Sequence, residues 1–121
     1  MVERVVPMIH VPDVRATAEW YVSIGFKLRG TNEPGGKMDW AALTFGSTEI
    51  MLSEGGHPSS AHRRELDLYV QTDDVDAVFN RLNGRVEIVE PLKNTYYGMR
   101  EFIIRDVNRF WITFGQPVES T

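Results

Sequence analysis

Cysteine is absent from this sequence of 121 residues. Its absence excludes disulfide bonds, thiolate nucleophiles and metal sites built on thiolates. Long apolar runs are absent as well, because no stretch approaches the roughly 20 residues that a membrane-spanning helix needs. The N-terminal residues 1–14 do not show the basic and then apolar pattern of a signal peptide. We therefore expect a cytoplasmic location and no membrane partner.

Positive charge is also scarce. Lysine and arginine number 13 against 17 acidic residues, which gives a net charge of −4. A general nucleic-acid binder needs a basic surface that displaces counterions from the phosphate backbone. The one basic cluster, HRR at residues 62–64, is too short to follow such a backbone. We therefore expect no nucleic-acid partner.

What the sequence does contain is clear near its end, where RFWITFG alternates between two kinds of side chain. In a strand, Phe110, Ile112 and Phe114 would point to one face, and Trp111 and Thr113 to the other. The first set is typical of a buried core. The second raises the question of what a face that carries a tryptophan and a threonine contacts.

The order strand, helix, strand, strand, strand is expected twice. Apolar residues recur at helical spacing after Asp13 and after Asp74, which can cap the helices, and Gly25 and Gly84 end them. Alternating segments predict strands at 3–11, 26–32, 38–45 and 48–54, and then at 65–71, 85–90, 99–106 and 109–115. The two halves agree in the order of their elements and in where their helices begin and end. This agreement favours a duplicated module over an α+β sandwich whose halves match by chance.

The length suits a single domain made of two βαβββ modules. Module one is expected over about residues 1–54 and module two over about residues 65–116. Residues 55–64, GGHPSSAHRR, are polar and rich in glycine, proline and serine, which is typical of a linker.

Three segments in this order carry a family resemblance: VPDVRATAEWYVSIGF, TDDVDAVFNRL and YGMREFIIRDVNRFWITFG. With the doubled module, the chain resembles the vicinal oxygen chelate superfamily, also called the glyoxalase/bleomycin resistance/dioxygenase fold. The resemblance covers essentially the whole chain. It implies an α+β fold in which two βαβββ modules curl their mixed sheets into a cup, with the helices outside and the ligand on the inner face.

The resemblance implies that Trp111 and Thr113 line this cup, while the alternate residues pack under the helices. One turn departs from the family pattern, which usually reads Asp-Pro-Asp/Asn-Gly and here is DVNR at residues 106–109. Without the glycine, we expect Asn108 or Arg109 to take a positive φ, at a cost of about 1 kcal/mol.

Enzymes of the family hold one divalent cation on four strands. The resemblance places the corresponding positions at Val6, Met51, Asp67 and Thr113. One carboxylate cannot hold a metal ion, because such sites need at least three protein ligands. A register error of two residues would bring in His10, Glu49, Glu65 or Trp111. We expect no metal and no other cofactor, and the register error leaves a metal site as the alternative.

The positions facing the cup combine aromatic rings, methionine and carboxylates. Such a surface suits a flat aromatic ligand that can carry positive charge. The alternative is that the aromatic residues belong to the core or to a dimer interface. The residues that we expect to bind the ligand are Trp40, Met51, Asp67, Tyr69, Tyr97, Glu101, Ile103, Trp111 and Thr113.

Within the family, the chain looks most like the bleomycin resistance branch, whose members are metal-free homodimers that sequester an antibiotic in crevices between subunits. We therefore expect a homodimer that binds a bleomycin-like or other aromatic, cationic drug, with no catalytic residue. Two alternatives stay open. One is a metal-dependent lyase, isomerase or dioxygenase of the same superfamily. The other is a metal-free protein that transfers a proton through Glu101 or Asp67, or that senses a metabolite.

Overall fold

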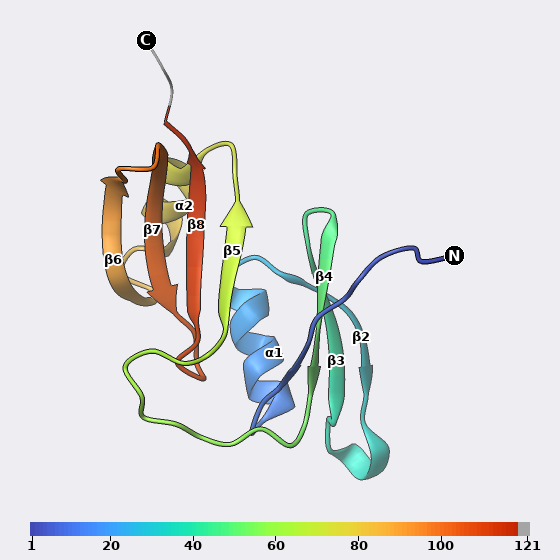
Figure 1. Cartoon of the computed structure of the whole chain (residues 1–121). Helices are drawn as coiled ribbons and strands as arrows, with labels where there is room; N and C mark the ends of the chain where they lie inside the picture. Colours follow the sequence, from blue (N-terminus) through green and yellow to red (C-terminus); the bar gives the residue numbers. More distant parts are fainter. Residues whose placement is uncertain (119–121) are drawn as a thin grey trace. The chain divides into compact units, whose positions relative to one another are not determined.

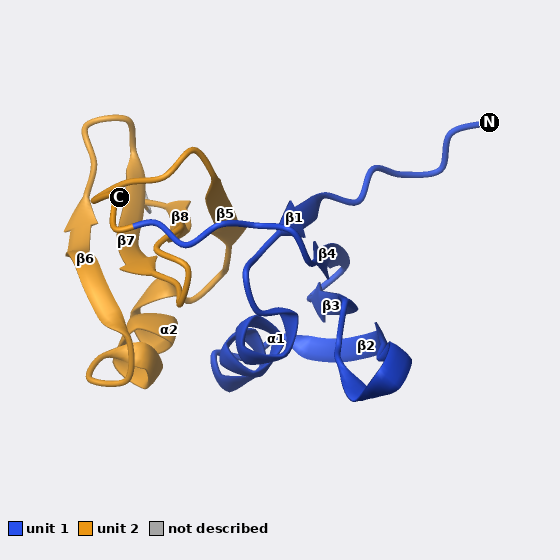
Figure 2. Cartoon of the chain, turned by 90° about the horizontal axis from the view of Figure 1, so that it is seen from below, with its two compact units in different colours: residues 1–59 blue, residues 60–121 orange. Residues whose placement is uncertain are grey.

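The computed structural model describes residues 1–118, which divide along the chain into two compact units, with the boundary between Ser59 and Ser60 (Figure 2). Unit 1 contains β1 (Met8–His10), α1 (Val14–Ser23), β2 (Lys27–Asn32), the short 3-10 helix η1 (Pro34–Gly36), β3 (Trp40–Phe45) and β4 (Thr48–Ser53). Unit 2 contains β5 (Asp67–Gln71), α2 (Val75–Leu82), β6 (Glu87–Asn94), β7 (Met99–Arg105) and β8 (Trp111–Pro117). The predicted α+β class and the repeated βαβββ order are confirmed. The predicted limits of the modules, 1–54 and 65–116, stay a prediction.

Each unit builds a four-stranded mixed sheet, in the order β1-β4-β3-β2 in unit 1 and β5-β8-β7-β6 in unit 2. The first and last strands of each module run parallel, β1 with β4 and β5 with β8, and the other pairs are antiparallel. Each helix packs on its own sheet, α1 against β2, β3 and β4, and α2 against β7 and β8 (Figure 1). We call the opposite side of each sheet the helix-free face of that unit.

The helices begin and end where the sequence predicts. The Asp13 carboxylate accepts a backbone N–H from the first turn of α1 at 3.0 Å, and Asp74 does the same for α2 at 3.1 Å. Two residues past the last helical residue, Gly25 has a φ of 119° and Gly84 one of 87°. Glycine adopts these angles without strain, so after each helix the chain can turn into the next strand.

The alternation along β8 separates core from helix-free face. Ile112 and Phe114 are 0% exposed, and the Phe114 ring stacks on Phe102 with centroids 5.0 Å apart. Trp111 and Thr113 lie on the other face and are only half-buried. The predicted division of this strand into a core side and a second side is therefore confirmed.

Two strands differ from the prediction by more than two residues at one end. β1 covers only Met8–His10, because β4 pairs with it from Met51 to Ser53 and Pro7 has no N–H to donate. β6 runs on to Asn94, past the predicted end at residue 90, and includes Pro91. An edge strand tolerates proline, and the β6–β7 pairing shifts register on both sides of Glu90.

The β7–β8 turn also behaves as expected. The Asp106 carboxylate accepts the backbone N–H groups of Asn108 at 2.7 Å and Phe110 at 2.9 Å. Arg109 has a φ of 71°, and within residues 1–118 it is the only non-glycine residue with a positive φ. The positive φ that was expected at Asn108 or Arg109 thus falls on Arg109.

This angle leads to a stability prediction. We expect the Arg109→Gly variant to be about 1 kcal/mol more stable than Arg109→Ala, since glycine alone adopts the angle without a Cβ clash. Both variants lose the hydrogen bond from the Arg109 guanidinium to the carbonyl of Ala61, 2.8 Å long, so their difference reports the backbone. Chemical denaturation of the two proteins measures it, and equal stabilities would contradict the assignment.

Candidate functional site

The helix-free face of unit 2 carries most of the residues predicted to bind a ligand. Strand pairing sets Asp67 beside Trp111 and Tyr69 beside Thr113. The antiparallel pairing of β7 with β8 sets Ile103 beside Thr113. The structure therefore brings these predicted residues together on three adjacent strands, β5, β8 and β7.

Glu101 organises the middle of this face. It is 5% exposed, and each of its carboxylate oxygens accepts a phenol hydrogen bond. Tyr69 donates to Oε2 at 2.6 Å and Tyr97, in the turn from β6 to β7, donates to Oε1 at 2.5 Å. The tyrosine side chains remain about half exposed, at 48% and 56%. One buried carboxylate thus holds two aromatic rings in place at the surface.

Gly115 makes room for this arrangement. A Cβ at this position would lie 2.2 Å from the Tyr69 hydroxyl oxygen, 2.9 Å from its Cζ and 3.2 Å from Cγ of Glu101. The first two distances are too short for a Cβ contact, so a side chain at this position would require the Tyr69 hydroxyl end to move. Tyr69 therefore reaches Glu101 by crossing β8 at the one residue that has no side chain to block it.

The carboxylate also shifts the ionisation of both phenols. Burial of its hydroxyl, followed by the hydrogen bond and the negative charge of Glu101, raises the pKa of Tyr69 well above its ordinary value. The hydrogen bond to Glu101 comes first for Tyr97, followed by partial burial, and it raises that pKa as well. Both tyrosines therefore act as hydrogen-bond donors and remain neutral at physiological pH.

A pH titration tests this network. The stabilisation that Tyr69 contributes should be fully present below about pH 10, the ordinary tyrosine pKa, and should be lost only as the pH rises through the raised folded-state value. We expect the ultraviolet absorbance of tyrosinate to show late ionisation of Tyr69 and Tyr97. In Glu101→Gln, both should ionise at lower pH, because the negative charge is gone. An unchanged titration curve would show that Glu101 does not hold the phenols.

Trp111 lies at the other end of this face and is partly covered. The guanidinium of Arg63 lies over its ring, 4.3 Å from the centroid, and the His62 ring meets its edge. The indole N–H donates to the His62 carbonyl at 3.3 Å. Arg63 also pairs with Asp67 at 2.6 Å. The HRR cluster, predicted to be linker, thus contacts the predicted site.

The remaining predicted residues, Trp40 and Met51, lie on the helix-free face of unit 1. Both are half-buried, and Met51 pairs with Ala42 on β3 and with Met8 on β1. Next to them on β4, the side chain of Glu49 is 2% exposed and pairs with Arg29 at 2.5 Å. Each unit therefore has a buried carboxylate on its helix-free face. Arg29 neutralises Glu49 in unit 1, and Tyr69 and Tyr97 donate hydrogen bonds to Glu101 in unit 2.

Among the four positions aligned with family metal ligands, Asp67 alone carries a carboxylate. Val6 precedes β1, Met51 and Thr113 are half-buried on different units, and Asp67 is bound to Arg63. Across residues 1–118, no group of three or more histidine, aspartate or glutamate side chains could hold a metal ion.

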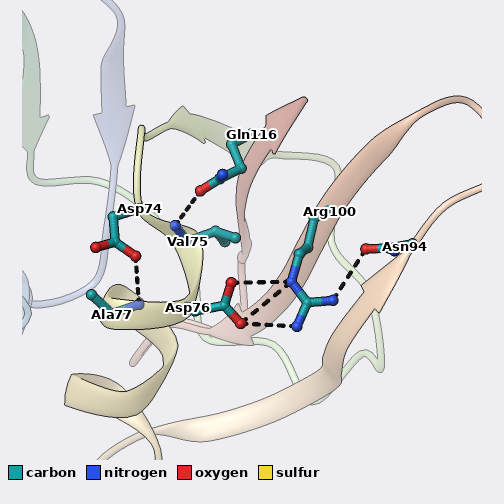
Figure 3. A network of polar contacts seen from close by, with 7 residues as sticks. All are labelled: Asp74, Val75, Asp76, Ala77, Asn94, Arg100 and Gln116. Atoms are coloured by element: carbon teal, nitrogen blue, oxygen red, sulfur yellow. Dashed lines mark hydrogen bonds and ion pairs between the residues drawn. The ribbon is translucent and has the colours of Figure 1, made fainter. Parts of the chain in front are cut away.

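A separate hollow of about 390 Å³ lies at the start of α2 and is lined by Asp76, Asn94, Arg100, Gln116, Pro117 and Val118. Figure 3 shows the Arg100 guanidinium directed at Asp76 and Asn94. It donates a hydrogen bond to the Asp76 carboxylate at 2.8 Å and another to the Asn94 side-chain oxygen at 3.1 Å. This contact lowers the pKa of Asp76 and raises that of Arg100. Gln116 accepts the backbone N–H of Val75. The charges of this hollow are satisfied by one another, and the network fixes α2 to the sheet.

The comparisons with known proteins agree with this fold. A family model for the Glyoxalase/Bleomycin resistance protein/Dioxygenase superfamily matches residues 4–114. The chain belongs to this superfamily. No curated protein matches the sequence. Within the described part of the chain, neither helix is long and apolar enough to cross a membrane.

Solved structures of other proteins have the same architecture. TioX from Micromonospora sp. ML1 is 24% identical, with a TM-score of 0.79 over 97% of this chain and 100% of that one. The bleomycin-binding protein of bleomycin-producing Streptomyces verticillus, in complex with copper(II)-bleomycin, is 21% identical, with a TM-score of 0.72 over 99% and 100%. A bleomycin resistance determinant encoded on the transposon Tn5 is 15% identical, with a TM-score of 0.73 over 96% and 98%. At these identities the likeness shows the fold.

Sequence reasoning missed three residues of this face. The sequence predicts only the end of a strand at Gly115, and nothing in the sequence places this residue under the Tyr69 ring. Arg63 and His62 were assigned to the linker because their segment is polar. One signal was available, since an arginine four residues before Asp67 can pair with it locally, as it does here.

Proposed function

We propose that the helix-free face of unit 2 binds an aromatic small molecule that carries positive charge, and that the protein sequesters it without chemical change. The observation that supports this most is the Glu101 network, which holds the rings of Tyr69 and Tyr97 at the surface about half exposed. Rings that are already fixed lose little conformational freedom on binding, so stacking contributes more to affinity.

Charge on the same face favours a cation. Asp67 lies beside Trp111, and a carboxylate next to an aromatic face attracts positively charged planar groups. Membership of the superfamily, together with structural neighbours named for binding bleomycin, supports an antibiotic of that kind as the ligand. A homodimer with ligand crevices between subunits, and a cytoplasmic location, stay predictions that belong to this proposal.

Replacement of Trp111 tests the proposed site. If bleomycin or a flat cationic antibiotic stacks on this ring, Trp111→Ala should weaken its binding by about 1–3 kcal/mol, the usual range for an aromatic residue at the centre of an interface. Isothermal titration calorimetry of the two proteins measures the difference. Trp20→Phe is the matched control, because Trp20 is in α1 of unit 1 and should leave affinity unchanged. Equal affinity in all three proteins would remove Trp111 from the site.

A further inference from the structure

Arg63 occupies the surface that a cationic ligand would use. Its guanidinium lies 4.3 Å over the Trp111 ring, and one of its nitrogens is 2.6 Å from a carboxylate oxygen of Asp67. Stacking on an aromatic face combined with a carboxylate contact is how proteins recognise planar cations such as guanidinium. The chain therefore already shows, with its own side chain, which chemical group fits between these two residues.

The segment that carries Arg63 is held in place by other contacts. Arg109 donates to the Ala61 carbonyl at 2.8 Å, and Arg105 donates to the His62 carbonyl at 2.8 Å. Arg64 donates to the Asn108 carbonyl at 3.1 Å. The backbone on both sides of Arg63 is thus fixed to the β7–β8 end of the sheet. Removal of the Arg63 side chain should leave this backbone where it is.

The Arg63 side chain itself is only weakly held. The side chains of Arg63 and Asp67 are 57% and 40% exposed. Water screens ion pairs this exposed. Such a pair changes the equilibrium between its formed and broken states by no more than about fivefold. A ligand that brings its own planar cation can therefore displace Arg63 at little cost.

We infer that Asp67 and Trp111 form a subsite for a planar cationic group of the ligand, guanidinium-like in shape, and that Arg63 fills this subsite until the ligand displaces it. The inference rests on the proposed function, since it assigns one part of the same face to one part of the ligand. It adds the chemical class of that part and a residue of this chain that competes with it. Removal of Arg63 should then strengthen binding, the reverse of what loss of a ligand contact does.

The test uses methylguanidinium chloride as the probe and the full chain labelled with ¹⁵N. The indole N–H signal of Trp111, assigned by its absence in Trp111→Phe, is followed at constant ionic strength in the wild type, Arg63→Ala and Arg85→Ala. Arg85 is exposed on the loop after α2, so its replacement removes the same charge away from the subsite. The dispersion of the spectra shows that each variant is folded.

We expect Arg63→Ala to bind methylguanidinium more tightly than the wild type and Arg85→Ala, by up to about fivefold. The gain should disappear when Asp67→Asn is added to Arg63→Ala. Equal dissociation constants in Arg63→Ala and the wild type would overturn the inference, and so would a gain that survives Asp67→Asn.

Bleomycin added to the same samples separates this inference from the proposed function. If methylguanidinium shows the gain and bleomycin does not bind, the subsite stands and the proposed drug ligand is wrong. If bleomycin shifts Trp111 in the wild type and methylguanidinium shows no gain, the proposed function stands and the subsite is wrong.

Discussion

Replacing Phe114 with alanine is expected to lower the free energy of unfolding by about 3–5 kcal/mol. The ring is 0% exposed and stacks on Phe102 with centroids 5.0 Å apart, while Phe102 meets Phe79 of α2 at 5.2 Å. Truncation therefore opens a cavity where α2 packs on the sheet. Chemical denaturation followed by circular dichroism measures the change.

The neighbouring Thr113→Ala is the matched control for strand parity. Thr113 is half-buried on the helix-free face, so its replacement should cost less than about 1 kcal/mol. The two residues are adjacent in one strand and differ in the face that they occupy. A Thr113→Ala cost equal to or above that of Phe114→Ala would show that β8 presents the other face to the core.

Gly115→Ala is expected to be costly although glycine in a strand interior usually weakens the strand. The new Cβ would lie 2.2 Å from the Tyr69 hydroxyl oxygen, so Tyr69 must move and lose its hydrogen bond to Glu101. Overpacking and the loss of a bond to a charged group together should cost about 2–4 kcal/mol. The same displacement should bring the ionisation of Tyr69 back towards lower pH, because the Glu101 contact is broken.

A double-mutant cycle isolates the cause. In a Tyr69→Ala background the main clash partner is gone, so Gly115→Ala should cost much less than in the wild type. The coupling measured between the two positions should exceed about 1 kcal/mol. Additive effects would mean that Gly115 is needed for a reason unrelated to Tyr69, and the account of how this face is built would be wrong.

The fold was predictable because it depends on local rules. Asp13 and Asp74 cap their helices through hydrogen bonds within one turn, and the alternation in RFWITFG assigns Phe114 and Thr113 to opposite faces without knowledge of any partner strand. The family's turn pattern, which has a glycine missing here, predicts a positive φ at Asn108 or Arg109, and it falls on Arg109.

The candidate site was less predictable because its contacts join distant parts of the chain. Parity places Glu101 and Tyr69 on one face, but it does not show that Glu101 accepts hydrogen bonds from two phenols at once. It also does not show that Gly115 creates the space for one of them. The strand β1 is shorter than its alternation suggests for a similar reason, since a strand extends only as far as its partner pairs with it.

The helix-free face of unit 2 is proposed to bind a cationic aromatic ligand. The most direct measurement is a titration of bleomycin into ¹⁵N-labelled protein, followed at the indole N–H signals of Trp111 and Trp20. We expect a saturable shift of the Trp111 signal, while the signal of Trp20, on α1, stays in place. Saturable binding that leaves Trp111 unmoved, or that shifts Trp20 alone, would contradict it.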